Sequence, residues 1–200
     1  MDNEIRVKIV VLGESTVGKT CLISRFVKDS FVLNHLSTIG VDVQKKEFDY
    51  PDGRKCTLQI WDTAGQEKFR SLSGHYLRNT DGVILLYDIT NYDTFEKVAN
   101  WIETINSSIR ECSTVIIGNK IDLEDKRVVS KVEGMNMAYS FKSKFAEASA
   151  KSGEGVEECF KILIQEIYKR EKEKNGENSS ENLKLTDKRT KESKSLCCGS

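Results

Sequence analysis

Residues 13–20, GESTVGKT, have the residue types and spacing of a phosphate-binding loop, GxxxxGK[ST]. The glycines at 13 and 18 let such a loop wrap an anion, so that backbone N–H groups point inward. Lys19 is placed to reach β- and γ-phosphate oxygens, and Thr20 offers a hydroxyl to Mg²⁺ at the positive start of a helix. The alternative is a chance glycine-rich turn, which matches in about one chain in a hundred of this length.

A second group of polar residues selects the base. Asn119, Lys120 and Asp122 form an NKxD pattern directly after a predicted buried strand. A carboxylate at Asp122 accepts from both N1–H and the exocyclic amine of guanine, and adenine offers neither donor. Asn119 would tie this loop to the phosphate loop, and the Lys120 stem would cover the base. Residues 149–151, Ser-Ala-Lys, follow the last strand, where the Ala150 N–H would meet guanine O6. In this order, the patterns predict a guanine nucleotide site.

Residues 62–66, DTAGQ, end another predicted strand and have the chemistry to sense the γ-phosphate. Asp62 would hold the Mg²⁺ hydration shell, Gly65 would allow a close backbone approach, and Gln66 would orient the attacking water. Thr38 would close over the nucleotide with its hydroxyl on Mg²⁺ and its N–H on the γ-phosphate; considered alone, it is an ordinary loop threonine. Losing that phosphate would release both loops, which predicts an order–disorder switch.

The elements that must position these residues alternate between strands and helices. Apolar residues recur at helical spacing from Phe95 to Ile109 and from Val156 to Ile167. Residues 5–12, 83–88 and 114–118 are apolar runs of the length of buried strands, and residues 41–50 and 54–62 are typical of two strands joined by a hairpin turn at 51–53. This alternation predicts an α/β layered fold with a mostly parallel sheet. Ligands of such sheets bind beyond the carboxyl ends of the strands, where the motifs above are expected.

The bulk composition fits one domain and a tail. The chain has 200 residues, with 31 basic and 31 acidic side chains, and this balance argues against a general nucleic-acid binder. Four scattered cysteines show no zinc or disulfide spacing and are expected to be reduced thiols: Cys21, Cys56, Cys112 and Cys159. There is no secretory signal or membrane-spanning run. Lys, Glu, Asn and Ser dominate after residue 168, which predicts a flexible linker over 171–196.

The order of these motifs resembles the Ras superfamily of small GTPases over residues 5–170. Within it the chain is most similar to Rab proteins, through four stretches: IGVD at 39–42, LQIWDTAGQE at 58–67, FRS at 69–71 and YDIT at 87–90. The resemblance implies a P-loop NTPase G domain over 1–170. Its sheet would have six strands, mostly parallel with one antiparallel edge strand, and helices on both faces. It also implies a GTP/GDP switch that hydrolyses GTP with Mg²⁺ and recruits effectors in vesicle traffic.

The same resemblance extends the set of site residues. It implies nucleotide contacts from the rest of the phosphate loop, from the residue after it and from an aromatic against guanine: Ser15, Thr16, Val17, Cys21 and Phe31. It implies effector contacts at His35, Ile39, Gly40, Val41, Asp42, Val43, Trp61 and Tyr76. Val43 stands where Rab proteins usually have Phe, and His35 replaces a usual tyrosine, so effector identity does not carry over. Trp61 has plain core packing as its alternative.

The final residues, Cys197-Cys198-Gly199-Ser200, resemble the Rab ending that receives two geranylgeranyl groups; single prenylation at Cys197 is the alternative. This predicts a monomer anchored by lipid to the cytoplasmic face of a membrane and cycling with the cytosol. The implied partners are an exchange factor, a GAP, a GDP-dissociation inhibitor, a prenylation escort protein and GTP-specific effectors. Two other functions stay open from the residues: a binding module that does not cycle, and an ATP-using P-loop enzyme.

Overall fold

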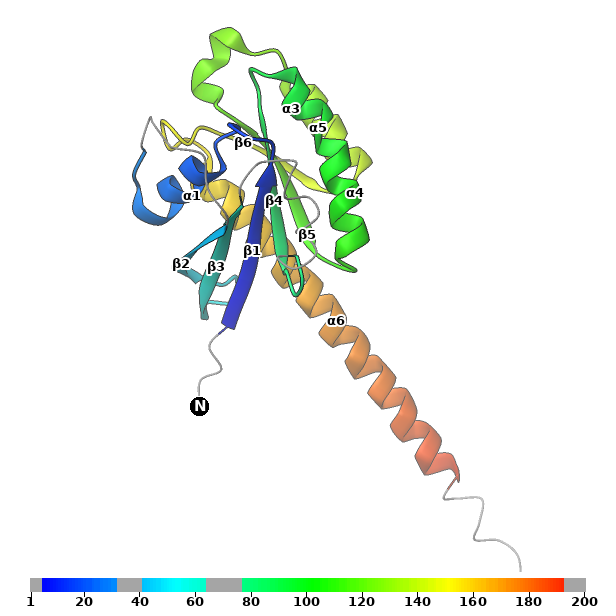
Figure 1. The fold of residues 1–200 in the computed structure, drawn as a ribbon. Coiled ribbons are helices and arrows are strands. Elements are labelled where there is room, and N and C mark those ends of the chain that lie inside the picture. The colour runs from blue at the N-terminus through cyan, green and yellow to red at the C-terminus, as the bar shows by residue number, and fades with distance from the viewer. Residues whose placement is uncertain (1–4, 32–40, 64–76, 193–200) are drawn as a thin grey trace, which may run out of the picture. The chain divides into compact units, whose positions relative to one another are not determined.

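The computed structural model describes residues 5–31, 41–63 and 77–192, with side chains as far as residue 176 (Figure 1). Six strands form one sheet in the order β2-β3-β1-β4-β5-β6. Their bounds are β1 Ile5–Gly13, β2 Val41–Asp49, β3 Lys55–Thr63, β4 Gly82–Asp88, β5 Ser113–Asn119 and β6 Lys144–Ala148. β2 is antiparallel to β3, and every other neighbouring pair is parallel. The prediction of a mostly parallel sheet with one antiparallel edge strand is confirmed.

The helices cover both faces of this sheet. They are α1 Lys19–Lys28, α3 Tyr92–Glu96, α4 Val98–Ser108, α5 Lys131–Ser140 and α6 Val156–Glu192, with a 3₁₀ helix, η2, over Ile121–Lys126. Figure 1 shows α3, α4 and α5 together on one side. The single helix predicted from Phe95 to Ile109 is two helices, interrupted at Lys97. Lys97 keeps helical dihedral angles, so the apolar spacing runs through the interruption almost unchanged.

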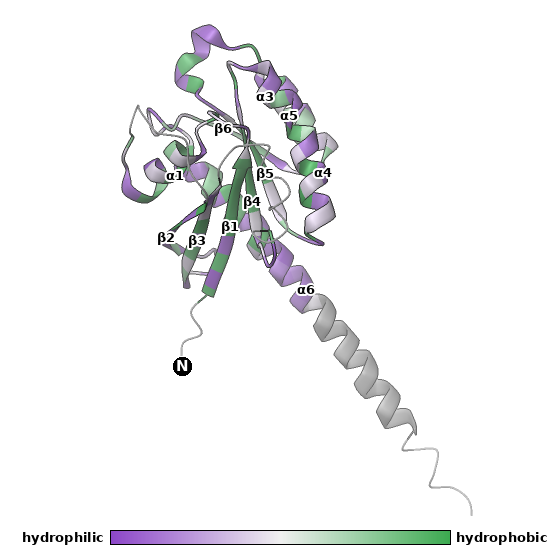
Figure 2. Ribbon diagram, in the orientation of Figure 1, coloured by the Kyte–Doolittle hydropathy of each residue, from purple (hydrophilic) through white to green (hydrophobic). Residues whose placement is uncertain are grey.

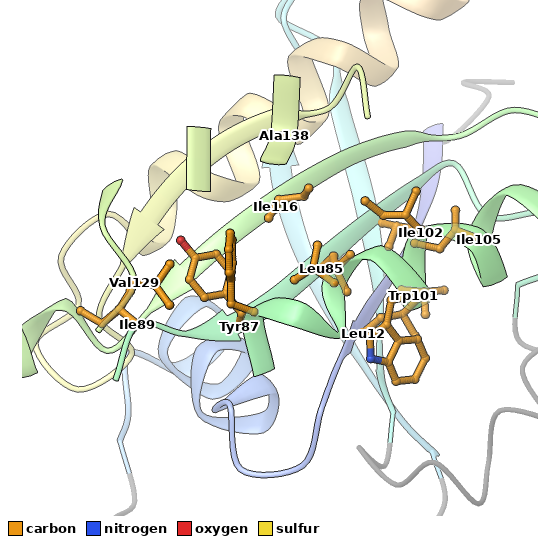
Figure 3. Close-up of a cluster of buried hydrophobic side chains, with 14 of the residues drawn as sticks. Leu12, Leu85, Tyr87, Ile89, Trp101, Ile102, Ile105, Ile116, Val129 and Ala138 are labelled. Atoms are coloured by element: carbon orange, nitrogen blue, oxygen red, sulfur yellow. The ribbon is translucent and has the colours of Figure 1, made fainter. Parts of the chain in front are cut away.

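The core explains why the central strands read as continuous apolar runs. All seven residues of β4 are buried, because helices cover both of its faces. One face packs a cluster that includes Leu85, Tyr87, Trp101 and Ile116 against α3, α4 and α5 (Figure 3). On the other face the ring of Phe26 from α1 stacks on Phe160 at the start of α6, with 3.7 Å between centroids. Figure 2 shows the same concentration of apolar residues in the central strands.

Beyond Ile167 the chain forms a second unit, which is helical to Glu192. The sequence predicts a flexible linker over 171–196 with only its first few residues in the helix; the structure assigns helix as far as Glu192, and the linker stays a prediction. Lys and Glu, which are frequent over these residues, are good helix formers. The division into domain, linker and lipid motif stays a prediction. Among the described helices, none has the length and apolar character of a membrane span.

Candidate nucleotide-binding site

The phosphate loop joins β1 to α1, and its two glycines are required by close contacts. Gly13 has φ of 138°, and a Cβ there would lie 2.4 Å from the carbonyl oxygen of Leu86. Gly18 has φ of 96°, and its Cβ would lie 2.5 Å from Nδ2 of Asn119. Positive φ values of this kind favour glycine over any residue with a side chain. The loop therefore follows a path that only the predicted glycines allow.

Lys19 is buried beneath this loop, at the first position of α1. Its Nζ donates to the carbonyl oxygens of Gly13 at 2.9 Å and Glu14 at 2.8 Å. An ammonium group has three donors, so one N–H is left to reach an anion. Burial lowers the pKa of Lys19 to about 8, while the nearby carboxylates of Asp62 and Glu14 raise it. An arriving phosphate adds negative charge and so favours the ammonium form.

Asp62 lies near the loop from the neighbouring strand, since its position on β3 pairs with Val11 of β1. It is 1% exposed, and its charge acts on both Lys19 and Cys21. Burial and Asp62 raise the pKa of the Cys21 thiol, and Lys120 lowers it. A carboxylate and the hydroxyl of Thr20 are hard oxygen donors of the kind that Mg²⁺ prefers. The described residues contain no group of three or more His, Cys, Asp or Glu side chains that could hold a metal ion by themselves.

Asn119 joins three segments that are distant in the sequence. It ends β5 and is 1% exposed. Its Nδ2 donates to the carbonyl oxygen of Val17 in the phosphate loop at 2.8 Å, and its Oδ1 accepts from the N–H of Ala150 at 3.2 Å. The expected tie between the base loop and the phosphate loop is therefore present. The Ala150 N–H, predicted to meet guanine O6, is directed to Asn119 in this structure.

The predicted base-selecting residues lie together around Asp122. Oδ1 of Asp122 accepts from the Ser149 hydroxyl at 2.6 Å, and its Oδ2 lies 3.7 Å from Nζ of Lys151. An ionised carboxylate has about four acceptor sites, so these contacts leave capacity for two further donors. Lys120 takes the left-handed conformation with φ of 71°, and its Nζ forms a 2.6 Å ion pair with Asp88.

Two contributors were missed by sequence reasoning. Arg25, on α1, donates from Nε to the carbonyl oxygen of Ala150 at 3.1 Å and from Nη2 to that of Lys151 at 2.9 Å. It therefore holds the 149–151 loop against the phosphate-loop helix. The carboxylate of Glu14 accepts from Trp101 and Lys97. In each of these contacts the two residues are separated by more than eighty positions, and no local pattern in the sequence connects them.

The described effector-contact residues lie on the edge strand β2 and on its neighbour β3. Val43 on β2 pairs directly with Trp61 on β3, and Val43 is 40% exposed. Trp61 is half-buried: it packs against the core cluster, and Nζ of Lys8 lies 4.5 Å from its ring centroid. It thus combines the two alternatives, display and core packing. Val41 is half-buried and Asp42 is exposed beside them.

Several predicted site residues lie outside the described residues, and their roles stay predictions: His35, Thr38, Ile39, Gly40, Gly65, Gln66, Tyr76, Cys197 and Cys198. Phe31 is described and half-buried. The other nucleotide contacts lie in the phosphate loop or at its end; Ser15 and Thr16 are exposed, whereas Val17 is buried.

A phosphate loop, an NKxD loop and a Ser-Ala-Lys loop, all beyond the carboxyl ends of a mostly parallel sheet, define the class of P-loop proteins that bind guanine nucleotides. Comparison with known proteins agrees. The family model for the Ras family matches residues 8–169. Ras-related protein Rab-8B of Bos taurus is 43% identical over 196 residues, covering 96% of this chain and 94% of the relative. Rab-8B of Homo sapiens is 41% identical over the same shares, and Rab-8A of Gallus gallus is 40% identical.

The chain belongs to the Rab family of small GTPases, within the Ras family. It binds guanine nucleotide, hydrolyses GTP and has the membrane-associated trafficking role of that family. These findings remove the ATP-using enzyme and the non-cycling binding module as alternatives.

Proposed function

We propose that the described loops hold GTP as a single assembled cradle and that the protein switches state when the γ-phosphate is lost. The observation that carries this proposal is the Asn119 side chain, which bonds at once to the phosphate loop and to the 149–151 loop. Because one buried amide joins both loops, the surfaces for the phosphates and for the base are set relative to each other before ligand arrives. Such preorganisation lowers the ordering cost of binding.

In this mechanism the base is read by Asp122 and the phosphates by Lys19. The Asp122 carboxylate accepts from N1–H and the exocyclic amine of guanine, with Ser149 and Lys151 fixing its orientation. Nζ of Lys19, already anchored on two loop carbonyls, directs its remaining N–H to the β- and γ-phosphate oxygens. The backbone N–H groups of the loop and the start of α1 complete the anion site. Phe31 packs against the base.

The hydrolytic step uses residues from three segments. Thr20, Asp62 and Thr38 would hold Mg²⁺, which would supply positive charge to offset the charge that develops on the transferred phosphoryl group. Gln66 orients the attacking water and Gly65 lets the backbone approach the γ-phosphate. As the family resemblance implies, unassisted turnover is slow and a GAP accelerates it.

We further propose that Cys197 and Cys198 carry two geranylgeranyl groups, because a single isoprenoid chain gives only marginal attachment to a bilayer. The protein would then sit on the cytoplasmic face of a membrane and return to the cytosol with a GDP-dissociation inhibitor. Its GTP form would present Val43 and Trp61, adjacent across β2 and β3, to effectors. Mass measurement of the protein from eukaryotic cells should show two isoprenoid adducts, one of which is lost in each single Cys→Ser variant.

Base recognition is tested with Asp122→Asn and a matched control, Asp125→Asn, which lies exposed on the same 3₁₀ helix. Affinities for GTP and for xanthosine triphosphate are measured by competition with a fluorescent nucleotide. We expect Asp122→Asn to weaken GTP at least about a hundredfold and to gain affinity for the xanthine nucleotide, whose base edge complements an amide. The control should match wild type. Unchanged GTP affinity in Asp122→Asn would refute the assignment of Asp122.

The catalytic assignment is tested by measuring phosphate release in single turnover. Gln66→Leu should lower GAP-stimulated hydrolysis by about a thousandfold or more, with little change in GTP affinity. Chelation of Mg²⁺ should both slow hydrolysis and speed nucleotide release. If Gln66→Leu hydrolyses GTP at the wild-type rate with the GAP present, the attacking water is oriented by another group.

A further inference from the structure

The phosphate loop has a side-chain anchor on the segment that contains α4. Glu14 is 8% exposed, and both of its carboxylate oxygens are engaged. Oε1 accepts from the indole Nε1–H of Trp101 at 3.0 Å, and Oε2 lies 3.1 Å from Nζ of Lys97. These partners lie 87 and 83 positions away in the sequence. The carboxylate thus joins the loop to Lys97, at the start of α4, and to Trp101, on its first turns.

The same residue contacts the phosphate-binding lysine. The carbonyl oxygen of Glu14 accepts from Nζ of Lys19, and the carboxylate raises the pKa of Lys19. A carboxylate whose charge acts on Lys19 competes with phosphate for that lysine and repels the bound nucleotide unless another cation offsets it. Lys97 supplies that cation. The charge is also buried, and a buried carboxylate without its partners is strongly unfavourable.

Trp101 is well placed to act as the fixed end of this anchor. It is 5% exposed and belongs to the cluster that contains Leu12 of β1 and Ile105 of α4 (Figure 3). Leu12 directly precedes the loop, so the indole supports both the strand that leads into the loop and the carboxylate that follows. A hydrogen bond from a packed indole to a charged group is among the stronger polar contacts in proteins.

We propose that Glu14 is a positioning residue of the phosphate loop, and that its attachment to Trp101 and Lys97 slows the release of guanine nucleotide. This inference rests on the proposed placement of the phosphates at Lys19. With the carboxylate held on the α4 segment, the loop keeps its binding shape and the negative charge stays paired. When either partner is removed, the charge is released next to Lys19 and the phosphates are held less tightly.

The test is a double-mutant cycle on the rate of GDP release, measured with fluorescent GDP chased by excess unlabelled GDP. Trp101→Phe removes the N–H donor and Lys97→Met removes the cation, each in wild type and in Glu14→Gln. We expect release to accelerate about tenfold in Trp101→Phe and about threefold in Lys97→Met. In the Glu14→Gln background, each second change should accelerate release by less than about twofold, because the charge is gone.

The comparison between the wild-type and Glu14→Gln backgrounds distinguishes a positioning role from simple packing. If Trp101 only filled space, Trp101→Phe would speed release equally in both backgrounds, and that result would overturn the inference. Lys97→Met gives an independent arm, because this half-exposed side chain leaves no core cavity. Lys142→Met, an exposed lysine after α5, is the matched control and should release GDP at the wild-type rate. Failure of wild-type protein to retain GDP would overturn the proposed phosphate site itself, which is a separate result.

Discussion

Replacing Asn119 with alanine should weaken nucleotide binding through the two loops that its side chain joins. The substitution removes the bond from Nδ2 to Val17 and the bond from Ala150 to Oδ1. Both partners are backbone groups in buried surroundings, and each one left unsatisfied costs about 1 to 3 kcal/mol. The free energy of unfolding should therefore fall by about 2 to 4 kcal/mol, after some relaxation of the two loops.

The effect on affinity follows from what the nucleotide must then do. Without the amide, the phosphate loop and the 149–151 loop are no longer joined, and binding has to order them. If most of the lost energy is recovered only in the complex, the Kd for GDP rises between about 30-fold and 1000-fold, since each 1.4 kcal/mol is a factor of ten. Asn119→Asp keeps an acceptor for Ala150 but sets a carboxylate against the Val17 carbonyl, so we expect it to be at least as damaging.

The assay is equilibrium and stopped-flow binding of fluorescent GDP, paired with urea unfolding of the same samples. Asn136→Ala, on the exposed face of α5, is the matched control and should change neither quantity measurably. The reasoning fails if Asn119→Ala binds GDP within about threefold of wild type while its unfolding free energy drops by the expected amount. That combination would mean that the two loops hold their binding geometry without this amide.

Three further predictions concern the scaffold. Gly134→Ala should lower the free energy of unfolding, measured by urea titration, by about 1 to 3 kcal/mol, because its Cβ would lie 2.4 Å from the Tyr87 hydroxyl. Gly176→Ala is the control: its Cβ would meet no atom within 4 Å, so this change should be neutral or slightly stabilising. Burial raises the pKa of the Cys159 thiol to about 12. The protonated thiol therefore contributes fully to the free energy of unfolding below pH 9, and this contribution declines as pH rises from 9 to 12. Cys159→Ala should flatten this part of the pH–stability curve. Ser130→Ala breaks the capping box of α5 and should cost about 1 kcal/mol, measured as a lower midpoint in urea.

The sequence predicts best the features that depend on residues adjacent in the chain. Lys19 and the two glycines of the phosphate loop are contiguous, so their pattern specifies a loop before any tertiary contact is known. The buried strands are predicted for the same reason, since β-branched runs need no partner to be recognised. α5 is different: its buried residues Gly134 and Ala138 are small, so its inward face carries almost no apolar signal.

Apart from the tie between Asn119 and the phosphate loop, contacts between distant segments are not predicted from the sequence. Arg25 reaches the 149–151 loop across 125 positions, and Glu14 reaches Trp101 across 87. An arginine on a helix and a glutamate in a loop read as solvated side chains, and only the sheet order makes them neighbours of the site. Over 171–192 the low apolar content is compatible with a flexible linker, and the Lys and Glu residues are compatible with a helix, so composition alone does not decide between the two.

Lys120 has a consequence for the kinetics of nucleotide capture. A residue with a side chain is held here in the left-handed conformation, at a cost of about 1 to 2 kcal/mol, and its ammonium group is fixed on Asp88. The protein adopts this strained conformation when it folds, so nucleotide binding does not have to impose it at each cycle of loading and release. Lys120→Gly would reach the same backbone angles without strain but would lose the anchor. The loop would then spend part of its time in shapes that no guanine ring fits, and capture would slow in proportion to that fraction.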